Sequence, residues 1–107
     1  MRALLLVAIL TARHPYPADR PAPVGERIVK EVFPPELWKW ALDVAWCEST
    51  RKGDARNGRF RGMYQLGPRE WRAHRPRPDA NIFDRRDNAL AALSLYRSRG
   101  AKPWVCR

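Results

Sequence analysis

Apolar residues gather in three stretches of the chain, and proline and arginine fill the intervals between them. The stretches cover residues 3–10, 37–47 and 89–96. The central one follows Pro34 and Pro35, which suit a first helical turn because that turn leaves the amide hydrogen unpaired anyway. Side chains at the three- and four-residue spacing of one helical face then follow, namely Trp38, Ala41, Leu42, Ala45 and Trp46. We expect a largely buried helix over residues 34–48.

This pattern ends after Ser49. Residues 51–62 contain three glycines and Asn57 among several arginines. Glycine and asparagine favour turns. We therefore expect an exposed, cationic, turn-rich segment with at most a short hairpin around residues 59–64.

Two later helices are predicted from their end signals. Pro68 suits the first position of a short helix, which the proline-rich residues 75–79 end. Asp84 can cap a longer helix that carries the apolar residues of the stretch 89–96, and Gly100 ends it. With the central helix, these elements predict a mainly α fold in one small domain.

The N-terminal region divides into two predicted parts. Residues 1–12 contain one arginine and then the apolar run 3–10, which is the pattern of a secretory signal peptide. That run is too short for a membrane span, which takes about 20 residues. Residues 13–33 are predicted to be a proline-rich, extended linker. The folded domain is then expected over residues 34–107.

The charge of the chain narrows the class of partner. Lysine and arginine number 21 against 11 aspartates and glutamates, which gives a formal net charge of +10, and 17 of the cations are arginine. Arginine keeps its charge at any working pH and pairs with carboxylates and phosphates. Such a surface attracts anionic polymers, whether nucleic acid or the polymers of a bacterial envelope. Charge alone does not choose between them.

The two cysteines, Cys47 and Cys106, lie far apart and outside any CxxC pair. Neither a zinc site nor a thioredoxin-type motif is indicated. Two buried thiols and a disulfide both stay open, and a disulfide would stabilise the fold by about 4 kcal/mol in the chain-entropy model. His14 and His74 lie in segments without a second ligand pattern, so we expect no metal site.

Glu48 is the candidate catalytic acid because it ends the predicted buried helix and opens into the turn-rich segment. Apolar neighbours and the negative end of a helix dipole raise the pKa of a carboxyl, which suits a general acid near neutral pH. The basic residues of the segment 51–61 act in the opposite direction. A lone glutamate at a helix end is ordinarily a solvated surface charge. The surrounding motifs therefore decide the interpretation.

The order of these motifs resembles that of the lysozyme-like lytic transglycosylases, over about residues 36–106. The motifs are Glu48-Ser49 at the end of the long helix, Gly62-Met63-Tyr64-Gln65, and Asn88 with Tyr96 on a later helix. More narrowly, Cys47-Glu48-Ser49 and the terminal Pro-Trp-Val-Cys are similar to resuscitation-promoting factors. Met63 departs from the leucine usual at its position. The ordered set is more specific than any one motif.

The resemblance implies a fold, a reaction and residue roles. The fold would be a small lysozyme-like helical domain with a short hairpin or turn-rich segment after the catalytic helix. Glu48 would protonate the bond between N-acetylmuramic acid (MurNAc) and N-acetylglucosamine (GlcNAc), then accept the proton of the C6 hydroxyl, which leaves a 1,6-anhydro-MurNAc end. No cofactor would be needed. The substrate-binding residues would be Gln65, Tyr64, Met63, Tyr96 and Asn88, and the family's disulfide would correspond to Cys47–Cys106.

Several of these residues have plain structural alternatives. Tyr96 is either near the catalytic glutamate or a core aromatic with a bonded hydroxyl. Asn88 is either structural or part of the cleft. Trp71 and Trp104 could stack on sugars, but packing is the more ordinary role of such tryptophans.

Two other functions stay open. Ordinary glycosidases place a second carboxylate about 5–10 Å from the acid, and Asp54 is the nearby candidate, so a water-using lysozyme is one alternative. The other is a non-catalytic basic module that binds the wall or nucleic acid through its arginines.

On the favoured hypothesis the protein is an exported monomer that cleaves peptidoglycan glycan strands in the cell wall. Anionic wall polymers would hold it there, and nucleic acid is the less favoured partner. The sequence leaves open whether a bacterium or a phage encodes it.

Overall fold

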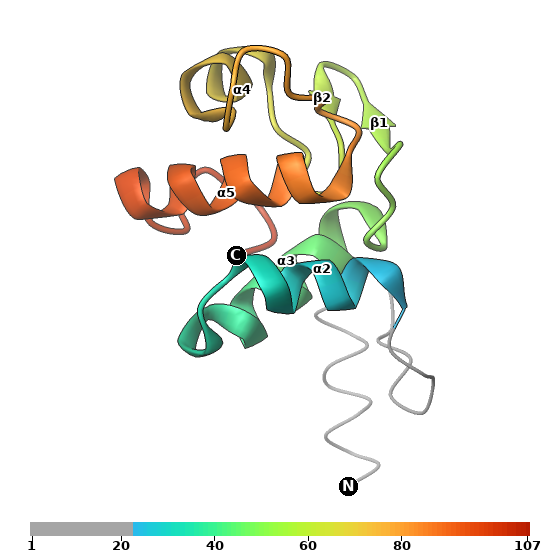
Figure 1. Cartoon of the computed structure of the whole chain (residues 1–107), viewed down its shortest axis with the longest axis vertical. Coiled ribbons are helices and arrows are strands. Elements are labelled where there is room, and N and C mark those ends of the chain that lie inside the picture. Colours follow the sequence, from blue (N-terminus) through green and yellow to red (C-terminus); the bar gives the residue numbers. More distant parts are fainter. Residues whose placement is uncertain (1–22) are drawn as a thin grey trace, which may run out of the picture.

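The computed structural model describes residues 23–107. Most of it is helical, and two very short strands lie between the second and third α-helices (Figure 1). The elements are α2 (Val24–Val32), the 3-10 turn η1 (Pro35–Leu37), α3 (Trp38–Ser49), β1 (Arg56–Asn57), β2 (Phe60–Arg61), α4 (Pro68–His74) and α5 (Arg85–Arg99). The predicted mainly α fold is confirmed. The predicted signal peptide, residues 1–12, lies outside the described residues, as does the linker before residue 23.

Helix α2 corrects the predicted domain boundary. The sequence predicts a linker through residue 33, but residues 24–32 form a helix that packs against α3 and α5. Val29 is 0% exposed and Phe33 only 2%. Ile28, Val29, Val32 and Phe33 have helical spacing, which the prolines on both sides obscure. The folded domain therefore includes α2, which precedes residue 34.

The three helices predicted from the sequence are confirmed, with small shifts at their ends. The chain forms η1 first and then α3, which ends at Ser49. Helix α4 starts at Pro68. Asp84 caps α5 by accepting a hydrogen bond from the Asp87 amide at 2.9 Å, and Gly100 follows its end with φ 66°.

The hairpin lies earlier in the chain than predicted. Strands β1 and β2 pair antiparallel, with Arg56 opposite Arg61 and Asn57 opposite Phe60. The predicted range, 59–64, instead contains the start of a second tight turn, because the amides and carbonyls of Arg61 and Leu66 bond each other across it. Two successive turns therefore follow α3.

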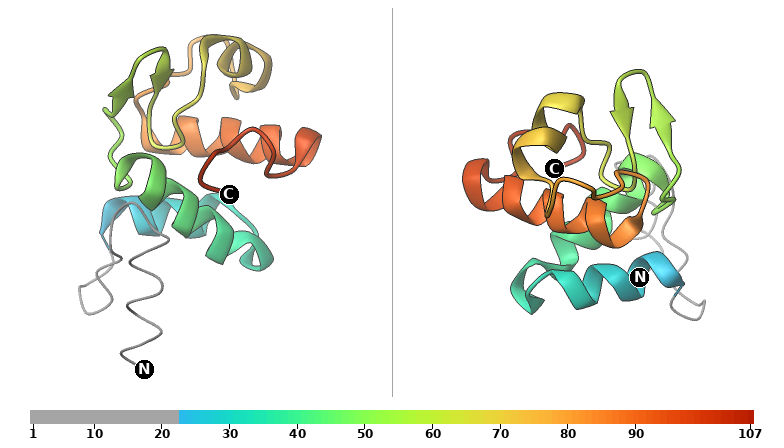
Figure 2. Two further views of the ribbon diagram at one scale, coloured as in Figure 1. Left: turned by 180° about the vertical axis from the view of Figure 1, so that it is seen from behind. Right: turned by 45° about the horizontal axis from the view of Figure 1, so that its top comes forward.

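The buried core surrounds that second turn. Helices α2 and α3 lie on one side of α5, and the hairpin and α4 lie on the other, as both views of Figure 2 show. The C-terminal segment passes between α3 and α5 (Figure 2). The core joins small residues of α3 and α5 to the turn, including Ala41, Ala45, Ala89, Ala92, Met63, Tyr64 and Leu66. Within residues 23–107, no helix has the length and apolar character needed to cross a membrane.

A disulfide joins Cys47 near the end of α3 to Cys106 at the C-terminus, with 6.0 Å between the two Cα atoms. The bridge that the sequence left open is confirmed. It closes a loop with a sequence separation of 59 residues. The C-terminal segment is thereby tied to the helix that carries Glu48.

Candidate functional site

Glu48 lies partly buried in the last turn of α3, where the chain reverses sharply. Thr50 and Arg51 both adopt left-handed backbone conformations, with φ of 51° and 62°. Two consecutive non-glycine residues rarely adopt this conformation, because the side chain crowds the backbone and each such residue costs roughly 1 kcal/mol or more. Contacts with the surrounding residues must therefore stabilise this strained turn, which directly follows Glu48 and Ser49.

Arg51 supplies much of that support. Its guanidinium folds back along α3 and donates to the Leu42 carbonyl oxygen from Nε at 3.3 Å and from Nη2 at 3.1 Å. Its amide donates to the Ala45 oxygen at 3.1 Å, and its own carbonyl accepts from Arg85 Nε at 2.8 Å. These contacts fix the position of Glu48 relative to α5.

Ser49 connects the catalytic candidate to the second turn. Its hydroxyl is buried and donates to the Met63 carbonyl oxygen at 2.7 Å. Glu48 is the preceding residue, so this bond places the end of α3 against residues 62–65. The end of α3 and the Gly62–Gln65 segment are therefore in contact.

Met63 and Tyr64 do not line a groove, which corrects their predicted role. Both are 0% exposed. The Tyr64 hydroxyl donates to the Ala41 carbonyl oxygen at 2.8 Å, and Trp104 Nε1 donates to the Tyr64 carbonyl oxygen at 3.0 Å. Burial raises the pKa of Tyr64 well above its ordinary value, against a smaller lowering by the charge of Arg51. Tyr64 is thus a neutral core residue.

Asn88 is also interior and not a substrate-binding residue in this structure. It is 0% exposed, and its Oδ1 accepts from the Tyr64 amide at 2.7 Å. Its Nδ2 donates to the Ile82 oxygen at 2.9 Å and to the Arg61 oxygen at 3.3 Å. The structural alternative is correct for Asn88, because it holds the turn against α5.

Gln65 combines a left-handed backbone conformation with a buried side-chain oxygen that has no hydrogen-bond partner among the described residues. Its φ is 53°, and it is 8% exposed. Its Nε2 donates to the Gly62 oxygen at 2.9 Å and to the Ala55 oxygen at 3.3 Å. Its Oε1 is buried and has no hydrogen-bond partner among the described residues. Buried acceptors are normally paired, so this oxygen suits an N–H or O–H donor from outside the protein.

Tyr96 lies toward the other end of α3 from Glu48. Its ring packs on Trp40 with 4.6 Å between ring centroids. Trp40 precedes Glu48 by eight residues, which is about 12 Å along a helix axis. The packing alternative accounts for this position, and the contact between Ser49 and the turn that contains Gln65 forms without Tyr96.

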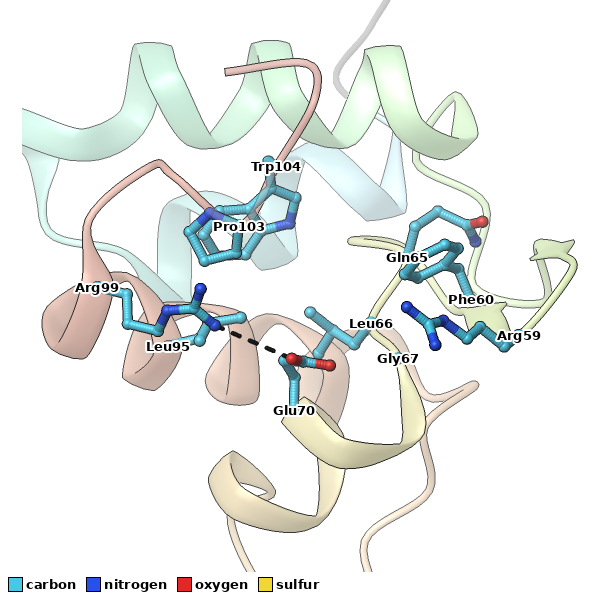
Figure 3. A pocket seen from close by; sticks show the side chains of 10 residues that line it. All are labelled: Arg59, Phe60, Gln65, Leu66, Gly67, Glu70, Leu95, Arg99, Pro103 and Trp104. Atoms are coloured by element: carbon cyan, nitrogen blue, oxygen red, sulfur yellow. Dashed lines mark ion pairs between the residues drawn. The ribbon is translucent and has the colours of Figure 1, made fainter.

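A cavity of about 190 Å³ lies beside Gln65, among the hairpin, α4, α5 and the C-terminal segment (Figure 3). Its apolar lining comes from Phe60, Leu66, Leu95, Pro103 and Trp104, and its polar lining from Gln65 and Glu70. Gly67, Arg59 and Arg99 complete the lining. Glu48 does not line this cavity, which connects to the end of α3 through Gln65, in the turn that Ser49 bonds.

Sequence reasoning missed the residues that α4 and α5 contribute to this cavity. Glu70 and Arg99 lie 29 residues apart in the chain, and neither stands in a recognisable motif. The sequence favours packing for Trp104, which is indeed only 3% exposed, but its side chain also lines the cavity. The terminal Pro103-Trp104 pair was the available signal.

The remaining candidates are spread over the surface. Asp54 is exposed in the loop after α3. His74 Nδ1 lies 2.9 Å from Ser94 Oγ. Among residues 23–107, no three His, Cys, Asp or Glu side chains gather in a way that could hold a metal ion.

Comparison with known proteins gives no match to a family model, to a curated protein or to a solved structure.

Proposed function

We propose that this protein cleaves the MurNAc–GlcNAc bond of peptidoglycan glycan strands, with Glu48 as general acid and then general base. The observation that carries the proposal is the joint between α3 and the second turn. There the Ser49 hydroxyl bonds the Met63 carbonyl at 2.7 Å, and Gln65 holds a buried, unpartnered amide oxygen. A carboxyl and an unpaired acceptor beside the same joint suit a substrate with glycosidic oxygens and acetamido N–H groups.

The reaction follows from one carboxyl group. Neutral Glu48 donates its proton to the glycosidic oxygen, and the bond from MurNAc C1 to that oxygen breaks. The Glu48 carboxylate then takes the proton of the MurNAc C6 hydroxyl while O6 bonds to C1. The products are a GlcNAc 4-hydroxyl end and a 1,6-anhydro-MurNAc end, and no water is consumed. Proton transfer of this kind contributes about 10²- to 10⁴-fold to a rate.

The disulfide and the basic surface support an extracytoplasmic site of action. Disulfides persist in oxidising compartments, and the +10 charge attracts anionic wall polymers. We therefore place the protein in the cell wall as a lysozyme-like monomer without a cofactor. A hydrolase that uses Asp54 would act on the same bond but leave a reducing end.

Mass spectrometry of the muropeptides released from purified peptidoglycan tests the proposal. The wild type, Glu48→Gln and the control Asp54→Asn are compared with the disulfide intact. We expect anhydro ends from the wild type and from Asp54→Asn, and at least about 100-fold less product from Glu48→Gln.

Reducing ends, together with loss of product in Asp54→Asn, would replace the transglycosylase by a hydrolase. If the wild type releases nothing while all three proteins bind the wall equally, the protein is a basic binding module and the enzyme proposal is wrong. Circular dichroism of each variant confirms that the fold is intact.

A further inference from the structure

The cavity beside Gln65 carries an excess of positive charge. Arg59 enters it from the hairpin and Arg99 from the last turn of α5, on opposite sides, with Glu70 between them (Figure 3). Arg99 Nη1 lies 3.9 Å from Glu70 Oε2, the long limit of an ion pair. The Arg59 guanidinium lies over the Phe60 ring at 5.3 Å and makes no ion pair within residues 23–107. Two cations therefore face one carboxylate.

The remaining lining strengthens the attraction for an anion. Leu66 and Leu95 are almost fully buried, and the Trp104 indole is 3% exposed. Apolar walls lower the local dielectric constant beside the two guanidiniums, which themselves stay in contact with solvent. A guanidinium binds a carboxylate through two parallel hydrogen bonds. The cavity is therefore suited to a carboxylate attached to a partly apolar group.

The place of the cavity relates this anion to the candidate acid. Gln65 lines the cavity and belongs to the turn that Ser49 holds against the end of α3. A glycan that bonds the Gln65 amide would thus bring a substituent of one of its sugars to Arg59 and Arg99. MurNAc differs from GlcNAc by a lactyl ether, which carries a carboxylate itself or through its attached peptide stem.

We propose that the cavity between Arg59 and Arg99 binds the carboxylate borne by the lactyl substituent of MurNAc, and so selects acidic glycans over neutral chitin chains. This inference rests on the proposed function for the identity of the sugar. The shared chemistry is a carboxylate on the 3-O substituent. Its source is either the free lactyl group or the peptide stem.

Binding measurements on the full chain in a Glu48→Gln background test the inference without cleavage. The probes are chitotetraose, the tetrasaccharide (GlcNAc–MurNAc)₂ with free lactyl groups, and the same tetrasaccharide with peptide stems. Arg59→Gln and Arg99→Gln are compared with Arg97→Gln, an equal charge loss on α5 outside the cavity. Isothermal titration calorimetry gives each Kd.

We expect Arg59→Gln and Arg99→Gln each to weaken binding of an acidic probe by roughly tenfold. Binding of chitotetraose should stay unchanged in both, and Arg97→Gln should change no probe. Loss with the peptide-free tetrasaccharide identifies the lactyl carboxylate as the ligand. Loss with the stem-bearing probe alone identifies the peptide stem.

Equal losses for chitotetraose, equal losses in Arg97→Gln, or no loss in the cavity variants would each overturn the inference. The two proposals fail separately. Selective, cavity-dependent binding without release of fragments from peptidoglycan refutes the cleavage and keeps the cavity. Release of fragments with unchanged binding in Arg99→Gln refutes the cavity and keeps the cleavage.

Discussion

The turn Gly62–Leu66 and the hairpin Arg56–Arg61 are neighbours in the chain, and the molecule holds them in opposite ways. Side chains from distant elements bond the backbone of the turn, including Asn88 at 2.7 Å and Trp104 at 3.0 Å. The strands of the hairpin bond each other, and outside the hairpin Arg61 at the end of β2 pairs with Leu66 and accepts a hydrogen bond from Asn88 Nδ2 at 3.3 Å. The arginines of the hairpin lie mostly in solvent. Changes in the turn should therefore alter stability, and changes in the hairpin should alter binding.

The largest expected effect comes from removing the disulfide. It holds the segment that carries Trp104 against the turn, and its sequence separation is 59 residues. We expect Cys47→Ser/Cys106→Ser to lower the free energy of unfolding by about 4 kcal/mol, mainly because the unfolded chain gains freedom. Denaturant unfolding measures this difference.

The wild type with reductant is the matched control for the double variant and should give the same midpoint. A loss below about 1 kcal/mol would mean that the noncovalent contacts of Trp104 suffice to hold the segment.

A pair of glycine substitutions tests the comparison directly. At Gly62, with φ +84°, an added Cβ would lie 2.1 Å from Asn88 Nδ2 and 2.4 Å from the Ile82 oxygen. Gly58 has φ +60° and nothing within 4 Å. We expect Gly62→Ala to destabilise by about 3 kcal/mol and Gly58→Ala by about 1 kcal/mol.

Thermal and denaturant unfolding of both variants provide the measurement. Equal losses at the two glycines would contradict the idea that the turn is held by its surroundings while the hairpin is not.

The same contrast explains how much of the fold and of the candidate site could be predicted from the sequence. Helices α3, α4 and α5 follow from local spacing and end signals, which act within a few residues. The roles of Met63 and Tyr64 do not, because the left-handed residues Gly62 and Gln65 decide which way the intervening side chains point. That direction depends on Asn88 and Trp104, far along the chain.

The domain boundary and the cavity were missed for related reasons. The prolines around α2 conceal an apolar stripe that is buried only when α3 and α5 are present. Arg59 and Arg99 both line the cavity although 40 residues separate them in the chain, so no local sequence pattern could indicate that they lie in the same site. The Glu48-Ser49 pair and Gln65 could be proposed from the sequence because each belongs to a short local motif.

The ion pair between Arg77 and Asp87 makes a smaller contribution to stability, and this contribution depends on pH. Arg77 bonds both carboxylate oxygens of Asp87 at 2.9 Å. Burial acts to raise the pKa of Asp87, but the Asn81 amide and the Arg77 guanidinium outweigh it, so the pKa lies below its ordinary value of 3.8. The lowered pKa means that the stabilisation is complete above the ordinary value and is lost as the pH falls through the lowered one.

We expect Asp87→Asn to lose about 1 kcal/mol at neutral pH, since Arg77 is half exposed and solvent screens it. The difference from the wild type should shrink as the pH falls through the lowered pKa. Denaturant unfolding at several pH values measures it, and a difference independent of pH would exclude the charge as its cause.

The smallest expected effect on stability lies in the hairpin, where we expect the largest effect on binding. Arg56 lies over the Phe83 ring at 4.5 Å, and Arg59 over Phe60. Exposed contacts of this kind contribute about 0.5–1 kcal/mol or less. We expect Arg56→Gln/Arg59→Gln to change the unfolding free energy by under about 1 kcal/mol and to lower the salt concentration that elutes the protein from an anionic polymer column.

The control for this variant is Arg69→Gln/Arg72→Gln, an equal loss of exposed charge on α4. If both pairs lower the elution salt equally, the polymer responds to net charge and the hairpin has no special part. A larger shift for the hairpin pair would locate the contact there. Since the turn would keep its stability in either case, that result would separate the part of this chain that binds from the part that holds the fold.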